Sequence, residues 1–299
     1  MGLSQTILKY VWNCAGSADE KRLAKQTPVE GVCQHLNVSY ADDRETAHFL
    51  DIYYPKKAET PLPIIVNIHG GGWMYGSKEL NTNYCKTFSK KGFVVFNINY
   101  RLAPEFHFDH QMRDVFSALG WISKNAPAYH GDLKNVFLMG ESAGGHLAAM
   151  IAAVHGDAAL EKVYGAESFN TKISAVGLVS PVIDLVSFNP MMNINLPVIL
   201  GKKYRKSPLY RYITFSDVYK GGTLPPFYLV SSSGDILARG QTKKLDRILT
   251  KHNIQHKFHF WGKYKGKSLP HVFCVMFYED APGKLTIEEM TDFFRKYMI

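Results

Sequence analysis

The segment Gly140–Gly144 constrains this 299-residue chain more than any other, because it places Ser142 two residues from a glycine on either side. An apolar, strand-like run at 135–139 precedes the segment, and a helix-like run at 146–153 follows it. Between a strand and a helix, a G-x-S-x-G sequence forms a tight turn that holds the serine in a strained backbone conformation. The sequence therefore predicts a nucleophile elbow that exposes the hydroxyl of Ser142.

A second glycine-rich turn, His69–Trp73, follows the apolar run at 63–68. A serine that attacks an acyl group creates an oxyanion, and backbone N–H groups must already point to the place where this charge develops. Glycine lets the backbone approach closely because it has no side chain. We therefore predict an oxyanion hole formed by the amides of Gly71, Gly72 and Ala143.

The same turn has two simpler interpretations, an ordinary strand-to-helix connection or a phosphate-binding loop. A phosphate-binding loop needs a Gly-Lys-Ser/Thr sequence or a G-x-G-x-x-G sequence that opens a helix. Neither sequence is found at residues 69–73. The pattern therefore favours the oxyanion hole.

Two further residues complete a candidate triad, because a serine nucleophile needs a histidine base and a carboxylate that orients it. After an elbow of this kind, the order along the chain is Ser, then Asp or Glu, then His. Asp235 follows the strand-like run at 227–231, where we expect a helix to start, and His271 lies in the loop after the run at 255–261. We predict Ser142, Asp235 and His271 as the catalytic residues.

Other residues compete for these roles. Asp184 follows the preceding strand-like run, one position too early in the order, and we interpret it as an anchor for its own segment. Three histidines lie in or beside a predicted helix and strand rather than in the following loop: His252, His256 and His259. Cys274 is close to His271 in sequence, but no elbow surrounds it, so we do not expect a cysteine nucleophile.

Three motifs together resemble the hormone-sensitive-lipase-like esterases: His69–Trp73, Tyr100–Glu105 and Gly140–Gly145. The resemblance spans nearly the whole catalytic domain and implies an α/β-hydrolase fold. In that family, the acid lies in an Asp-x-Leu segment and the base lies in a loop near the C-terminus. These positions match Asp235–Leu237 and His271.

The chain departs from the family pattern at two positions. Glu141 stands where the family usually has Asp or Thr, and Val272 follows the histidine where Gly is common. Neither change removes a catalytic group, but both affect the expected shape of the pocket. We interpret the segment 100–105 as a structural turn held by an internal ion pair.

Strand-like and helix-like segments alternate along the chain, which is typical of a mostly parallel sheet with helices on both faces. Two early runs, 32–40 and 47–54, are joined by a polar turn and predict an antiparallel hairpin. The runs predicted to form parallel strands are 63–68, 93–99, 135–139, 173–179, 227–231 and 255–261. We expect one α/β-hydrolase domain over residues 1–299 with a small cap.

Apolar spacing predicts two of the covering helices. In one helix, the side chains expected to face the sheet are Met112, Val115, Phe116, Leu119 and Ile122. The sequence Thr286–Glu289 predicts a capping box that opens the last helix. The buried side of this last helix is predicted to consist of Met290, Phe293, Phe294 and Met298.

The segment 185–223 interrupts the alternation. A loop of this length inside a compact domain usually covers or binds a ligand. Together with residues 1–28, we expect it to form the cap. Its apolar side chains are predicted to line an acyl pocket, although a packed helix pair explains them equally well: Met191, Met192, Leu196, Val198, Ile199 and Leu200.

The chain has a formal net charge of +9 and a pI near 9.2. We interpret its two densest basic stretches, 201–206 and 263–267, as solvated loops near the pocket that attract acidic or polar substrates. The four cysteines have no paired spacing, which favours reduced thiols and a cytoplasmic protein. The sequence indicates no leader peptide, no membrane or nucleic-acid partner and no metal or organic cofactor, and it leaves a homodimer open.

The expected activity is hydrolysis of small-molecule esters with short acyl chains, acetyl or butyryl, with acylated carbohydrates as one candidate class. Two alternatives stay open. An amidase or kynurenine-formamidase type would share the triad, although formamidases tend to carry an aromatic residue in place of Gly72. A non-catalytic ligand-binding module, like the plant gibberellin receptors that resemble this family, would lack the histidine that His271 supplies here.

Overall fold

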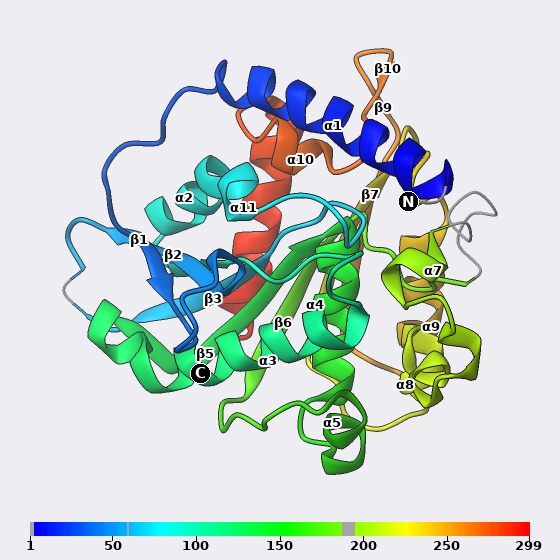
Figure 1. Cartoon of the computed structure of the whole chain (residues 1–299). Helices are drawn as coiled ribbons and strands as arrows, with labels where there is room; N and C mark the ends of the chain where they lie inside the picture. Colours follow the sequence, from blue (N-terminus) through cyan, green and yellow to red (C-terminus); the bar gives the residue numbers. More distant parts are fainter. Residues whose placement is uncertain (1–2, 59, 187–194) are drawn as a thin grey trace.

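One eight-stranded sheet organises the chain, in the order β1-β2-β4-β3-β5-β6-β7-β8, in the computed structural model (Figure 1). The structure describes residues 3–58, 60–186 and 195–299, with side chains from residue 11 onward. The strands are β1 (Val32–Ser39), β2 (Phe49–Pro55), β3 (Leu62–Ile68), β4 (Val94–Ile98), β5 (Gly131–Glu141), β6 (Ile173–Val179), β7 (Phe227–Ser232) and β8 (His256–Trp261). Strand β2 is antiparallel to β1 and β4, and β4, β3 and β5 to β8 run parallel. The predicted hairpin and parallel sheet are confirmed.

Helices cover both faces of the sheet, because the parallel strands carry apolar side chains on both sides. On β3, Ile64 and Val66 belong to one buried cluster and Ile65 to the other. The first cluster is closed by α3 (Phe108–Asn125), α4 (Ser142–Val154) and α9 (Gln241–Lys251). The second is closed by α2 (Thr82–Lys90), α10 (Phe273–Met276) and α11 (Ala281–Lys296).

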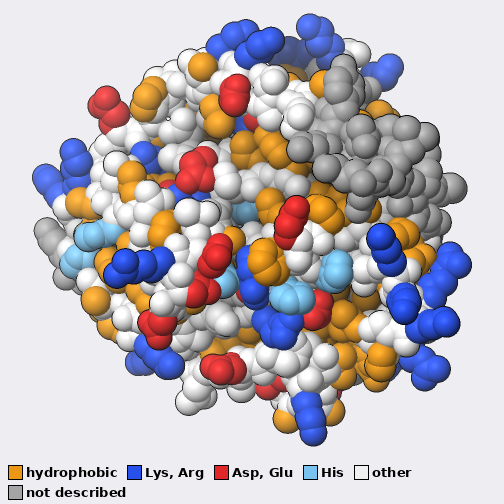
Figure 2. Space-filling model, in the orientation of Figure 1, with side chains coloured by type: hydrophobic (Ala, Val, Ile, Leu, Met, Phe, Trp, Pro, Cys, Tyr) orange, Lys and Arg blue, Asp and Glu red, His pale blue; other side chains and the backbone are white. Residues whose placement is uncertain are grey.

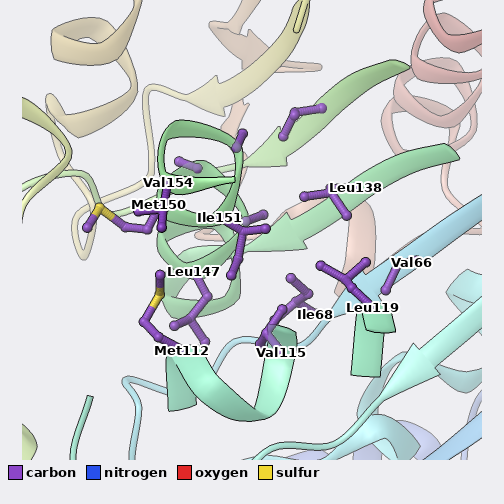
Figure 3. Packing of buried hydrophobic residues seen from close by; sticks show 14 of the residues in the cluster. Val66, Ile68, Met112, Val115, Leu119, Leu138, Leu147, Met150, Ile151 and Val154 are labelled. Carbon is purple, nitrogen blue, oxygen red and sulfur yellow. The ribbon is translucent and has the colours of Figure 1, made fainter. Parts of the chain in front are cut away.

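Helices α3 and α4 pack against the central strands within the first cluster (Figure 3). Met112 of α3 lies beside Leu147 of α4, and Val115 and Leu119 of α3 lie beside Ile68 and Val66 of β3. All five residues predicted to face the sheet from this helix are buried. This packing holds α4, and therefore the residue at its start, rigidly against the sheet.

The start of the last helix was predicted wrongly. Helix α11 begins at Ala281, and Thr286 lies inside it with its hydroxyl donating to the carbonyl of Pro282. Pro282 in the first turn favours the earlier start, because its φ already suits a helix. Met298 lies beyond the end of this helix and is 41% exposed, so it does not belong to the buried side, whereas Met290 is fully buried.

The segment 100–105 is held by a contact that the sequence did not indicate. Arg101 pairs with Asp114 of α3 through its Nε and Nη2 atoms, not with an acidic residue inside the segment. The same carboxylate accepts a hydrogen bond from the backbone N–H of Arg101. The predicted internal ion pair is therefore wrong, because the partner comes from the following helix.

The predicted cap consists of one long helix and, in the described part of the insert, several short helices and turns. The N-terminal part is α1 (Leu3–Leu23), and the described part of the insert contains α7 (Leu196–Ile199), a 3₁₀ turn at Tyr204–Lys206, another at Pro208–Tyr212, and α8 (Phe215–Val218). Leu196, Val198 and Ile199 are buried, and Leu196 and Ile199 belong to the first cluster. Met191 and Met192 lie outside the described residues.

The remaining elements connect these layers. They are three 3₁₀ turns at Thr46–His48, Lys78–Asn81 and Ala126–Tyr129, the helix α5 (Ala158–Tyr164), and a small hairpin of β9 (Lys263–Tyr264) and β10 (Lys267–Ser268). All four cysteines are unpaired. Among the described residues, no helix has the length and apolar character needed to span a membrane.

Two glycine substitutions test the packing of these layers. At Gly120, inside α3, an added Cβ meets nothing within 4 Å, so Gly120→Ala should raise the free energy of unfolding by about 0.5–1 kcal/mol. At Gly177 of β6, the Cβ would lie 2.7 Å from Sδ of Met290, so Gly177→Ala should lower it by about 1–3 kcal/mol. Urea unfolding measures both effects, and equal stability of the two variants would contradict the described contact of β6 with α11.

Candidate active site

The predicted nucleophile elbow is present at the end of β5. Ser142 has a φ of +52° and is the first residue of α4, so it adopts the strained turn that the motif requires. A Cβ on Gly144 would lie 2.0 Å from the carbonyl oxygen of Ile68, and one on Gly140 would lie 2.5 Å from that of Gly144. Both positions therefore require glycine, because backbone atoms fill the space.

The glycine-rich turn lies directly against this elbow. A Cβ on Gly70 would be 3.2 Å from Cβ of Ser142, and one on Gly71 would be 1.8 Å from the carbonyl oxygen of Tyr75. Gly71 and Gly72 have φ values of +116° and +59°, a region that favours glycine. Neither amide donates a hydrogen bond to another described backbone group, so both are available to an oxyanion.

Glu141 ties the elbow to the glycine-rich turn. Its Oε1 accepts a hydrogen bond of 2.6 Å from the backbone N–H of Gly70 and one of 2.9 Å from Nδ2 of Asn81. Complete burial raises the pKa of the Glu141 carboxyl to about 7, and these two hydrogen bonds oppose the shift. The sequence identified Glu141 only as a departure from the family, because its partners lie 60 and 71 residues away.

Asp235 and His271 are brought together as predicted. Nδ1 of His271 lies 2.8 Å from Oδ1 of Asp235, and this oxygen also accepts the backbone N–H of Ala238. The Asp235 side chain is 2% exposed and that of His271 is 14% exposed. Burial acts to raise the pKa of the Asp235 carboxyl, but the hydrogen bond and charge of His271 outweigh it and the pKa is lowered. The carboxylate therefore remains ionised at neutral pH.

The loops that carry these two residues are fastened to each other. The hydroxyl of Ser232 donates to the carbonyl of Leu269 at 2.7 Å, and a Cβ on Gly234 would lie 2.3 Å from the same oxygen. The absence of a side chain at Gly234 thus lets the loop before His271 approach Asp235. The helix expected at Asp235 begins only at Gln241, so this close approach involves a loop of turns and bends rather than a helix end.

The competing residues have other partners. His256 contacts Asp246, and His259 contacts Glu289 of α11, each through a ring nitrogen. Asp184 pairs with Lys244 and accepts a hydrogen bond from Ser216. His252 packs its ring against that of Tyr219.

The three candidate catalytic residues follow β5, β7 and β8, so they share the carboxyl edge of the parallel strands. No hydrogen bond joins the Ser142 hydroxyl to His271 within residues 3–58, 60–186 and 195–299. Such contacts are often long before a substrate binds. The arrangement therefore places a histidine, hydrogen-bonded to a carboxylate, at the same edge as the serine.

Helix α1 lies over the glycine-rich turn. The sequence predicted that this segment belongs to the cap but did not predict this contact. The ring of Trp12 stacks on Tyr75 at 5.3 Å, and a Cβ on Gly72 would lie 2.6 Å from the Trp12 ring. The hydroxyl of Tyr75 donates to Asp19 at 3.0 Å. The N-terminal helix thus contacts Gly72 of the turn through Trp12, and it contacts Tyr75, two residues after the turn, through Trp12, Gly16 and Asp19.

Two hollows lie outside the candidate triad. One of about 380 Å³ is bounded by α1 and residues 276–280, and one of about 360 Å³ is bounded by residues 200–207 of the insert. Neither is lined by Ser142, Asp235 or His271. In the described part of the chain, no group of three or more His, Cys, Asp or Glu side chains is arranged to hold a metal ion.

This sheet, its two helical layers and the elbow define an α/β-hydrolase. The chain belongs to the BD-FAE family, whose model matches residues 50–249. The crystal structure of esterase B from Lactobacillus rhamnosis is similar with a TM-score of 0.92 and 30% identity, covering 99% of this chain and 95% of that one. A structure of the same esterase is described as inhibited with a C4-C4 SN3 tributyrin phosphonate, with a TM-score of 0.93, 30% identity and the same coverage.

Among curated proteins, esterase LipC from Mycobacterium tuberculosis is 33% identical over 132 residues. This alignment covers 41% of this chain and 32% of LipC. The chain thus spans about a third of the length of that curated relative.

The buried carboxyl of Glu141 predicts a pH dependence of stability. Because its pKa is raised from 4.5 to about 7, the folded protein keeps a proton that the unfolded chain releases, and this stabilisation is lost as the pH rises through 7. Glu141→Gln keeps an oxygen for both hydrogen bonds but does not titrate. The free energy of unfolding of the variant, minus that of the wild type, should therefore increase by on the order of 3 kcal/mol between about pH 5 and 8.

Urea unfolding over this pH range measures the difference, with Glu30→Gln at an exposed position as the control. Parallel stability curves for Glu141→Gln and the wild type would contradict a protonated Glu141 in the folded protein.

Proposed function

We propose that this protein is a carboxylic ester hydrolase in which Ser142 is the nucleophile, His271 the general base and Asp235 the residue that orients the imidazole. The hydrogen bond between Nδ1 of His271 and Asp235 carries the proposal, because it leaves Nε2 as the nitrogen that faces a serine. The strained backbone of Ser142 at the same edge of the sheet supports it further.

The reaction proceeds in two acyl-transfer steps. His271 takes the proton from the Ser142 hydroxyl as its oxygen attacks the ester carbonyl, and then gives it to the leaving alcohol. The amides of Gly71, Gly72 and Ala143 stabilise the oxyanion of each tetrahedral intermediate. Water, deprotonated by His271, then attacks the acyl-enzyme and releases the acid, which regenerates the serine.

The proposed substrates are small esters with short acyl chains, acetyl or butyryl. The inhibition of the 30% identical esterase B by a tributyrin phosphonate supports butyryl-sized groups on a polyol. Acylated carbohydrates are a narrower option within the same class. We further propose that residues 1–299 act as one domain in which α1 and the segment 185–223 cap the site, which the contact of Trp12 with Gly72 supports.

Substitution of the proposed triad should remove turnover without unfolding the protein. Ser142→Ala should lower kcat for p-nitrophenyl butyrate by about 10⁴-fold or more, because no nucleophile remains. Asp235→Asn should lower it by about 10⁴-fold, because the imidazole loses its orienting carboxylate. His259→Gln is the matched control, since His259 contacts Glu289 instead of Asp235 and should keep wild-type activity. Equal rates for the wild type and Ser142→Ala would refute the assignment and favour a binding module or a specialised amidase.

The preference for acyl length tests the proposed substrates. Turnover of p-nitrophenyl acetate and butyrate should exceed that of the octanoate and palmitate, and a preference for palmitate would reject the short-chain proposal.

A tributyrin phosphonate should add its phosphonyl group to the wild type and not to Ser142→Ala, because only the serine oxygen displaces its leaving group. Intact-protein mass spectrometry followed by peptide mapping locates the adduct, and an adduct at any residue other than Ser142 would contradict the proposed nucleophile.

A further inference from the structure

Positive charge is concentrated in one part of the chain. Residues 195–278 contain 15 Lys and Arg and only three acidic residues, Asp217, Asp235 and Asp246. All other residues together contain 20 Lys and Arg and 23 Asp and Glu. The net charge of +9 therefore arises wholly from this segment.

Topology collects much of this charge at the edge that carries the candidate active site. The insert follows β6, the loop with Asp235 follows β7, and the β9–β10 hairpin follows β8, so all three leave the carboxyl ends of parallel strands. Nine exposed side chains in these segments and in the first turn of α9, here called the basic rim, are Lys202, Lys203, Arg205, Lys206, Arg239, Lys243, Lys263, Lys265 and Lys267. Figure 2 shows a group of Lys and Arg side chains on the right-hand side of the molecule, the side on which Figure 1 places α7 and α8, and others scattered over the rest of this face.

The charges of the basic rim are not neutralised within the described part of the protein. None of its nine side chains forms an ion pair with a described acidic residue. By contrast, Lys244 and Lys257, which lie nearby in sequence, pair with Asp184 and Glu289. Exposed charges of one sign without partners produce a field that attracts an anionic surface.

Exposed apolar side chains occur in the same part of the chain as these cations. Ile236 is 73% exposed and Leu237 is 57% exposed in the loop directly after Asp235, and Phe260 at the end of β8 is 42% exposed. Nζ of Lys243 lies 4.0 Å from the centre of the Phe260 ring. Aliphatic side chains beside lysines match the interface of an anionic membrane, where the first enter the acyl region and the second contact headgroups. A nucleic acid would use the cations but would leave Ile236 and Leu237 in water.

We propose that the basic rim binds the surface of an anionic lipid membrane, with Ile236 and Leu237 entering the interface. The active-site edge then faces the layer in which apolar esters dissolve. The sequence argued against a membrane partner because no segment could span a bilayer, but peripheral binding needs no span. This inference concerns location and does not depend on the proposed catalytic residues.

Vesicle sedimentation tests the proposal with the full chain. Vesicles of equal parts phosphatidylcholine and phosphatidylglycerol should bind the wild type at low salt, and pure phosphatidylcholine should bind it far less. The triple variant Lys263→Glu, Lys265→Glu, Lys267→Glu should lose affinity for the anionic vesicles by roughly a hundredfold or more. The control reverses the same number of charges at Lys56, Lys57 and Lys124, which are exposed in the loop after the antiparallel β2 and at the end of α3, and it should bind like the wild type.

Each outcome bears on the proposal. Equal weakening by the two triple variants would overturn it, because only net charge would then matter. Failure of the wild type to bind anionic vesicles, or tight binding of single-stranded DNA in preference to them, would overturn it as well. Turnover of p-nitrophenyl acetate in the absence of vesicles should be the same in both variants and the wild type, so a lack of esterase activity would be recognised separately from a lack of membrane binding.

Discussion

The close backbone contact between the start of α4 and the end of β3 determines the geometry of the whole site. Only glycine fits at position 144, because a Cβ there would lie 2.0 Å from the carbonyl oxygen of Ile68. This contact sets the elbow beside the glycine-rich turn, and Glu141 then holds the turn through the backbone N–H of Gly70. Ser142 and the candidate oxyanion amides are therefore parts of one rigid unit, as stabilisation of a developing charge requires.

The parallel sheet extends this unit to residues far apart in the chain. Strands β5, β7 and β8 end at one edge, so the serine, the carboxylate and the histidine lie at this same edge although the first and the last are 129 positions apart in the chain. The fastening of Ser232 to Leu269 brings the last two loops together. The same topology collects the basic loops at this edge, because they also follow the carboxyl ends of strands. Chemistry and surface charge thus share one architectural cause.

Sequence patterns predicted the features that depend on short stretches of chain. The hairpin, the parallel strands and the buried side of α3 follow from local apolar spacing, and the strained turn at Ser142 follows from its glycines. The predictions that failed depended on a choice between local and distant partners. Thr286 matched a capping box, but Pro282 starts the helix earlier, and Arg101 has an acidic neighbour at Glu105 yet pairs with Asp114.

The sequence by itself determined the fold class, the elbow and the residue types of the candidate triad, because glycine spacing and apolar periodicity act within one turn or one strand. Only the tertiary structure decided that Glu141 is the buried link to Gly70 and Asn81, and that Trp12 covers Gly72. It also decided that Ile236 is exposed and that Lys243 lies over the exposed Phe260 ring. These contacts join residues many positions apart, and their energies depend on burial and distance, which exist only once the sheet has brought the segments together.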